Sequence, residues 1–204
     1  MSVLVGKKAP DFCANAVVDG EIVSNFTLSQ FRGKKVILFF YPKDFTFVCP
    51  TEILAFQESI AEFTARDVQI IGCSTDSEFS HLAWLNTARD DGGIKGVKYP
   101  LVADINKTIS FDYDVLAGEH IMDEEGNQTI NGELVAYRGL FLIDKDGVVQ
   151  HQLVNNFGLG RSIKEAIRVV DALAHLEKYG EVCPMNWEKG DDAIKPDSKG
   201  ISDY

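Results

Sequence analysis

Residues 36–52 read VILFFYPKDFTFVCPTE, an apolar run that leads into a single cysteine followed by Pro-Thr-Glu. Six apolar residues rich in β-branched and aromatic types are too few for a helix and predict a buried strand over 36–41. Pro50 suits the first turn of a helix, where its missing N–H costs no hydrogen bond. We therefore expect Cys49 at a helix start, beside free N–H groups and the positive end of a helix dipole, which favour a thiolate.

Apolar strand patterns alternate with helical patterns beyond this stretch, which predicts an α/β fold. The expected elements are an N-terminal hairpin (16–18 and 21–24), helices at 50–65, 78–89 and 105–112, strands at 68–73 and 100–103, and a hairpin formed by 140–143 and 148–154. That second hairpin makes the central sheet mixed. An amphipathic helix is predicted over 161–178, with Ser162 as a cap and Gly180 at its end.

Length and composition limit the domain organisation. The 204 residues are 45% hydrophobic, which suits one domain over 1–180, followed by a polar tail over 181–204. The net charge of -11 disfavours a nucleic-acid or anionic-membrane partner. No apolar run is long enough to span a membrane, and Lys7 and Lys8 stand where an export signal would be apolar, so we expect a cytoplasmic protein.

Cysteines occur at positions 13, 49, 73 and 183, without any Cys-x-x-Cys pair. The four histidines lie far from one another and from any cysteine pair, so no metal or cofactor site is expected. A chain with an ample core needs no disulfide scaffold, which favours a reducing compartment. Cys13 and Cys73 are interpreted as small core residues.

Several motifs, in order along most of the chain, resemble those of a typical 2-Cys peroxiredoxin of the alkyl hydroperoxide reductase C and thiol-specific antioxidant family. They are Pro42-x-x-x-Thr46-x-x-Cys49 with Pro-Thr-Glu after it, Tyr137-Arg138-Gly139-Leu140-Phe141-Leu142-Ile143-Asp144, and Gly180-Glu181-Val182-Cys183-Pro184 with Trp187. The resemblance implies a thioredoxin-like fold with a mixed central sheet flanked by helices. It also implies that Cys49 is the peroxidatic cysteine and Cys183 the resolving one.

On the same resemblance, Pro42, Thr46 and Arg138 complete the active site, and Glu52 and Arg161 hold Arg138 in place. The chemistry asks for such residues, because a thiolate must displace one oxygen of an O–O bond while donors stabilise the departing oxygen. Simpler readings remain for three of them. Thr46 can be a turn residue, Arg138 can pair with an acidic neighbour, and Glu52 can form an ordinary salt bridge with Arg161.

The implied function is reduction of hydrogen peroxide and organic hydroperoxides through a Cys49 sulfenic acid. The sequence leaves open whether Cys183 reaches Cys49 of its own chain or of another. The resemblance implies an intersubunit disulfide in a homodimer, five dimers in a decamer, and recycling by thioredoxin or a flavoprotein disulfide reductase. The alternative function is an oligomeric holdase chaperone. A disulfide oxidoreductase would need the missing Cys-x-x-Cys, and Gly158-Leu159-Gly160-Arg161 lacks the third glycine of a nucleotide loop.

Two regions depart from the family pattern. The loop Gly92-Gly93-Ile94-Lys95-Gly96 replaces Gly-Gly-Leu-Gly, and the chain stops at Tyr204 without a Tyr-Phe helix. We therefore expect a shortened tail, easy local unfolding around Cys49 and resistance to over-oxidation. Residues 123–132 are expected to form a surface loop, and Phe45, Phe79 and Trp84 to be packing or subunit-interface aromatics.

Overall fold

The computed structural model describes residues 3–197 and 199–200 of the chain, in which no helix combines the length and hydropathy of a membrane span. Two compact units make up the chain, Met1–Arg161 and Ser162–Tyr204. The domain boundary predicted at residue 180 stays a prediction. The shortened chain end predicted at Tyr204 lies outside the described residues.

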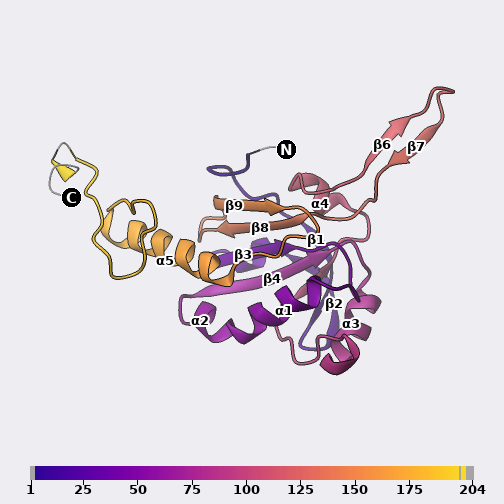
Figure 1. The fold of residues 1–204 in the computed structure, drawn as a ribbon, viewed down its shortest axis with the longest axis horizontal. Helices are drawn as coiled ribbons and strands as arrows, with labels where there is room; N and C mark the ends of the chain where they lie inside the picture. The colour runs from indigo at the N-terminus through magenta and orange to yellow at the C-terminus, as the bar shows by residue number, and fades with distance from the viewer. Residues whose placement is uncertain (1–2, 198, 201–204) are drawn as a thin grey trace. The chain divides into compact units, whose positions relative to one another are not determined.

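The first unit is built on a seven-stranded sheet with the strand order β2-β1-β5-β4-β3-β8-β9 (Figure 1). Its strands, in chain order, are β1 (Cys13–Val18), β2 (Glu21–Thr27), β3 (Lys35–Phe40), β4 (Val68–Ser74), β5 (Leu101–Ala103), β8 (Arg138–Ile143) and β9 (Val149–Asn155). β4 pairs in parallel with β3 and β5, whereas all other neighbours are antiparallel. The predicted mixed α/β sheet is confirmed.

Four short α-helices accompany this sheet: α1 (Cys49–Glu58), α2 (Ile60–Thr64), α3 (Glu78–Asn86) and α4 (Thr108–Asp112). The single helix predicted over 50–65 is wrong, because Ser59 departs from helical geometry and separates α1 from α2. The helices predicted to end at 89 and to begin at 105 are shorter than expected. Thr87 is already extended, and Lys107 precedes α4 in a left-handed conformation.

The central strands are buried along their whole length. Every residue of β3 and of β8 is buried, as expected for strands covered on both faces rather than one. On one face, Phe39 of β3 stacks on Phe56 of α1, with ring centroids 4.4 Å apart. The Tyr99 hydroxyl adds a hydrogen bond to the Ile53 carbonyl, 2.8 Å away. These contacts fix α1, and with it Cys49, on the sheet.

Strand register decides which residues meet at the end of β3. The chain leaves β3 at Phe40 and reaches Cys49 within one loop, while antiparallel β8 pairs Leu140 with Phe39. Because β8 runs in the opposite direction, its first residue, Arg138, lies at the edge where that loop begins. The sheet therefore brings Arg138 to the start of α1.

Residues 119–131 form a separate antiparallel hairpin, made of β6 (Glu119–Met122) and β7 (Gln128–Asn131). It projects from the sheet between α4 and β8 (Figure 1). All its strand residues are exposed, as expected for a surface segment, but they are paired strands rather than an irregular loop. Asp123 closes the turn by accepting hydrogen bonds from the backbone N–H groups of Glu125 and Asn127.

The second unit consists of α5 (Ile163–Tyr179) and the segment that follows it. Ser162 caps α5 by accepting a hydrogen bond from the Glu165 N–H, and Gly180 ends it in a left-handed conformation, as predicted. Val182 and Ile194 exchange backbone hydrogen bonds of 2.8 and 2.9 Å. The segment after α5 therefore folds into a closed loop over 183–193.

Candidate active site

Cys49 is the first residue of α1, with Val48 as N-cap and Pro50 in the first turn. No side chain caps this helix start, and Cys49 is only 1% exposed. The first-turn N–H groups and the helix dipole therefore act on the sulfur without competition from a capping oxygen. The sequence prediction that Cys49 begins a helix is confirmed.

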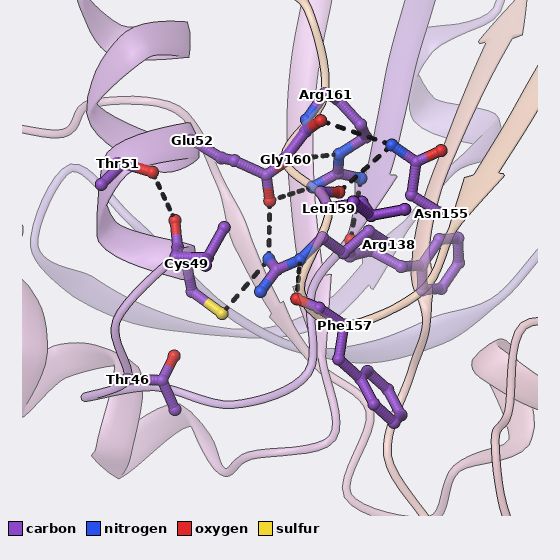
Figure 2. A network of polar contacts seen from close by, with 12 residues as sticks. Thr46, Cys49, Thr51, Glu52, Arg138, Asn155, Phe157, Leu159, Gly160 and Arg161 are labelled. Atoms are coloured by element: carbon purple, nitrogen blue, oxygen red, sulfur yellow. Dashed lines mark hydrogen bonds and ion pairs between the residues drawn. The ribbon is translucent and has the colours of Figure 1, made fainter.

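Arg138 faces the sulfur directly. Its Nη1 lies 3.5 Å from Cys49 Sγ and 2.7 Å from Glu52 Oε2, and its Nε donates to the Phe157 carbonyl at 2.6 Å (Figure 2). The guanidinium is thus fixed at two points and buried, with a side chain 4% exposed. A guanidinium in this place can donate a hydrogen bond to an oxygen that approaches the sulfur.

Glu52 connects Arg138 to Arg161. Its Oε1 accepts from the backbone N–H and from Nε of Arg161, both at 2.8 Å, and its Oε2 accepts from Arg161 Nη2 at 2.9 Å. Arg161 also donates to the carbonyls of Phe40 and Gly139 and lies over the Phe39 ring. Of the two readings of Glu52 and Arg161, the geometry fits support of Arg138 better than an isolated salt bridge.

The Glu52 carboxylate is stabilised by this arrangement. Burial alone raises the pKa of Glu52, but the hydrogen bonds and charge of Arg161, together with the charge of Arg138, outweigh it and lower that pKa. Glu52 therefore stays ionised at neutral pH, and the buried cluster contains one carboxylate between two guanidinium groups. The surplus positive charge lies on the side of the sulfur.

Thr46 and Pro42 belong to the loop between β3 and α1. The Thr46 hydroxyl donates a hydrogen bond to the Lys43 carbonyl, 3.0 Å away. The lone pairs of the hydroxyl oxygen remain able to accept a hydrogen bond. Thr46 and Arg138 flank the Cys49 sulfur in Figure 2. Pro42 is buried and has no N–H to offer. The bond to Lys43 is what a turn residue makes, and the role of Thr46 in the active site stays a prediction.

Cys183 lies in the second unit, where its thiol faces the Ala172 carbonyl at 3.6 Å. Partial burial raises the pKa of the Cys183 thiol, although the charge of Arg168 acts in the opposite direction. Trp187 anchors the same segment: it is 2% exposed, its ring lies 5.0 Å from that of His175, and its carbonyl accepts from Arg168. Cys183 is therefore a protonated thiol held against α5.

The two other cysteines differ in their exposure to solvent. Cys73 is buried, and burial raises its pKa well above the ordinary value, which fits the predicted core role. The same prediction for Cys13 is wrong, because its thiol is exposed on β1 and faces the Asn25 amide oxygen. Among the described residues, no group of three or more His, Cys, Asp or Glu side chains lies close enough to hold a metal ion.

Sequence reasoning missed two contributors to the site. The Phe157 carbonyl that orients Arg138 is a backbone group, which every residue type carries, so the sequence cannot predict it. Asn155 supports the same loop by donating to the carbonyls of Leu159 and Gly160. The sequence feature that could have indicated this role is the position of Asn155 at the end of β9, just before a Gly-rich turn.

Comparisons with known proteins agree over the whole chain. The profile of the AhpC/TSA family matches residues 5–152, and that of the C-terminal domain of 1-Cys peroxiredoxin matches residues 172–204. A chloroplastic 2-Cys peroxiredoxin BAS1 of Hordeum vulgare is 50% identical over 98% of this chain and 90% of its own length. Peroxiredoxin-2 of Mus musculus is 46% identical over 98% and 94%.

Solved structures give the same result. The reduced 2-Cys peroxiredoxin of Plasmodium vivax superposes with a TM-score of 0.88 at 44% identity, over 100% of this chain and 98% of that one. AhpC of Enterococcus faecalis gives a TM-score of 0.74 at 32% identity, over 89% and 99%. Sequence profile, relatives and fold therefore agree, and the chain belongs to the AhpC/TSA family, as a 2-Cys peroxiredoxin.

Proposed function

We propose that this protein is a thiol-dependent peroxidase that reduces hydrogen peroxide and organic hydroperoxides to water or alcohols. The observation that carries the proposal is the 3.5 Å approach of Arg138 Nη1 to Cys49 Sγ, on a guanidinium held by Glu52 and the Phe157 carbonyl. A buried cysteine at a helix start, beside a fixed donor, is arranged for nucleophilic attack rather than for packing.

In the first step, the Cys49 thiolate attacks one peroxide oxygen. The S–O bond forms as the O–O bond breaks, the departing oxygen takes up a proton, and Cys49 becomes a sulfenic acid. Arg138 donates to the oxygens as charge shifts between them, and Thr46 accepts a hydrogen bond from the peroxide O–H. Buried Pro42 shields the sulfur without adding a donor.

Stabilisation of the transition state contributes more than ionisation of the sulfur. An ordinary thiol is only a few per cent ionised at neutral pH, so full ionisation raises the reactive fraction roughly thirty-fold. The lower basicity of such a thiolate then costs roughly ten-fold in nucleophilicity. One preorganised donor is typically worth about 10² to 10³ in rate. Arg138, as such a donor, therefore accounts for more of the acceleration than ionisation does, and Thr46 contributes by orienting the peroxide.

The second step joins Cys49 to Cys183. The Cys183 sulfur attacks the sulfenic acid, an S–S bond forms, and the hydroxyl departs as water. We propose that Cys183 comes from the partner subunit of a homodimer, and that five dimers form a decamer. Thioredoxin or a flavoprotein disulfide reductase then reduces the disulfide. A 46% identical protein of Echinococcus granulosus is named thioredoxin peroxidase, which supports the first reductant.

The proposed location is the cytoplasm, where reducing conditions keep Cys49 and Cys183 ready for each cycle. Within that cycle we also propose resistance to over-oxidation. Mass spectrometry after stoichiometric peroxide, with reductant present, tests this point. Conversion of Cys49 to the sulfinic acid under those conditions would contradict it.

Stopped-flow measurements on the wild type, Cys49→Ser and Cys183→Ser proteins test the function. Cys49→Ser should consume no peroxide, whereas Cys183→Ser should complete one turnover with an unchanged first step. Non-reducing gels of peroxide-treated wild type should show a dimer-sized band, and a monomer-sized band alone would refute the intersubunit route. If the wild type consumes no peroxide but Cys49→Ser still protects an aggregating client, the holdase alternative holds instead.

A further inference from the structure

A second buried charged pair lies beside the active-site loop. His81 of α3 places Nδ1 2.8 Å from Asp44 Oδ2, with side chains that are 0% and 1% exposed. Asp44 sits between Pro42 and Thr46 in the loop that leads to Cys49. Neither residue touches the sulfur in the mechanism above, and no sequence pattern drew attention to them. A charged pair buried this completely is costly to maintain.

The surroundings of His81 specify its protonation state. Its Nδ1 faces the Asp44 carboxylate, and its Nε2 faces the Val102 carbonyl at 3.2 Å. A carbonyl oxygen can only accept, and Asp44 already receives hydrogen bonds from the Tyr41 and Ser80 hydroxyls, at 2.9 and 2.8 Å. An imidazolium supplies an N–H to both oxygens, whereas a neutral ring would turn a lone pair toward one of them.

The neighbouring charges agree with that geometry. Burial lowers the pKa of His81, but the hydrogen bond and charge of Asp44, the Val102 carbonyl and the charge of Asp76 together raise it. The Tyr41 hydroxyl, 3.5 Å from Nδ1, is the remaining titratable group beside the ring, and burial raises its pKa well above the ordinary value. Tyr41 therefore stays neutral, and His81 is the cation that balances Asp44.

The pair fixes the backbone of the catalytic loop. Besides binding His81, Asp44 donates its own N–H to Asp76 Oδ2 at 2.8 Å, and Asp76 in turn accepts from Ser74 at the end of β4. The next residue, Phe45, has a φ of 53°, a conformation that side-chain-bearing residues rarely adopt. Anchoring at Asp44 holds that conformation, and the following residue is Thr46.

We propose that His81, as an imidazolium bound to Asp44, is a positioning residue for peroxide reduction, which sets Phe45 and Thr46 in place beside Cys49. The inference rests on the proposed peroxidase function. It adds that α3, which supplies no group to the reaction, controls the geometry of the peroxide site. Raising the pH until His81 loses its proton should slow attack on peroxide.

Nitrogen NMR of the wild-type imidazoles tests the protonation directly, without reference to activity. His81 is assigned by elimination with His120→Asn, His151→Asn and His175→Asn variants. Both ring nitrogens of His81 should carry protons at neutral pH and remain protonated well above the titration of an exposed histidine. A neutral His81 ring at pH 7 would refute the inference and leave the peroxidase proposal intact.

Kinetics test the role in positioning. His81→Asn keeps one donor but removes the charge, and we expect the rate of Cys49 sulfenic acid formation to fall about ten-fold at an unchanged thiolate fraction, since small displacements of reacting groups are costly. The decline of the rate at alkaline pH, which we attribute to deprotonation of His81, should be absent from the His81→Asn variant. His120→Asn, on the exposed β6–β7 hairpin, is the matched control and should retain the wild-type rate and profile.

A double-mutant cycle separates the pair from a general loss of structure. Asp44→Asn alone and Asp44→Asn with His81→Asn should lose about as much rate as His81→Asn alone, because each breaks the same contact. Additive losses, or a His81→Asn rate within two-fold of wild type, would overturn the inference. If His81→Asn does not fold, Ser80→Ala and Tyr41→Phe each remove one bond to Asp44, and unchanged rates in both would count equally against it.

Discussion

Glu52 Oε1 accepts hydrogen bonds from both the backbone N–H and the side-chain Nε of Arg161, each 2.8 Å long. The carboxylate is thereby tied to the chain at Arg161 as well as to its guanidinium. Its second oxygen, Oε2, accepts from Arg161 Nη2 and also binds Arg138, the residue that faces the sulfur. The position of the Arg138 guanidinium is thus set by a carboxylate one helical turn away from Cys49.

Replacing Glu52 with glutamine should destabilise the fold. The substitution leaves two buried guanidinium groups without a counter-charge, and removing one partner of a buried pair typically costs about 3 to 5 kcal/mol. Urea denaturation measures the free energy of unfolding. Glu58→Gln, on the same helix but with a side chain 68% exposed and 3.6 Å from Arg89, is the control and should cost under about 1 kcal/mol. Equal effects of the two substitutions would contradict the arrangement.

The contribution of Glu52 should also depend on pH. The folded protein lowers the pKa of Glu52. The contribution of the Glu52 carboxylate to folding stability is therefore complete above the ordinary glutamate pKa of about 4.3, and it is lost as the pH falls through the lowered pKa of the folded state. The difference in unfolding free energy between wild type and Glu52→Gln should therefore be constant from pH 7 to about pH 5 and shrink below pH 4. A difference that grows on acidification would reverse the predicted sign.

Arg138→Ala should slow peroxide reduction by about 10² to 10³, because it removes a preorganised donor from the transition state. The thiolate fraction of Cys49, followed by ultraviolet absorbance, and the rate constant for peroxide must be measured on the same protein. A loss of rate no larger than the loss of thiolate would sink the claim that Arg138 acts mainly on the transition state. Arg89→Ala removes a surface arginine, paired with exposed Glu58, and serves as the control.

Trp187→Ala should release Cys183. The indole packs on His175 and donates to the Asp191 carbonyl at 3.1 Å, so its loss opens the loop that holds the thiol against α5. We expect alkylation of Cys183 in the reduced protein to accelerate several-fold. Met185→Ala, at a side chain 89% exposed in the same loop, should leave the alkylation rate unchanged. Unaltered alkylation in Trp187→Ala would show that the indole does not restrain the thiol.

Much of the architecture could be predicted because its signals are local. The six apolar residues at 36–41 are a strand because they are buried on both faces, and Pro50 marks a helix start because it lacks an N–H. Gly180 marks a helix end because it adopts a left-handed conformation. The sulfur, its arginine and the supporting Glu52 followed from motifs that the chain carries intact.

The remaining features depend on contacts between distant positions. Asp44 and His81 meet only because α3 packs beside the loop after β3, and neither residue has a neighbour in sequence that reveals the pair. Cys13 is exposed at the start of β1, which no property of the residue itself predicts. The break at Ser59 follows from backbone geometry within an otherwise continuous helical pattern.

The β6–β7 hairpin also determines how proteases act on this protein. No lysine or arginine occurs between Lys107 and Arg138, so trypsin leaves the hairpin whole. Glu124 and Glu125 at its exposed turn are accessible to a glutamate-specific protease. A single cut there places Cys49 and Arg138 on separate polypeptides. The nicked protein is then a complementation system, in which pairing of β3 with β8 and the ion pairs of Glu52 with Arg138 and Arg161 keep the two fragments together at Cys49.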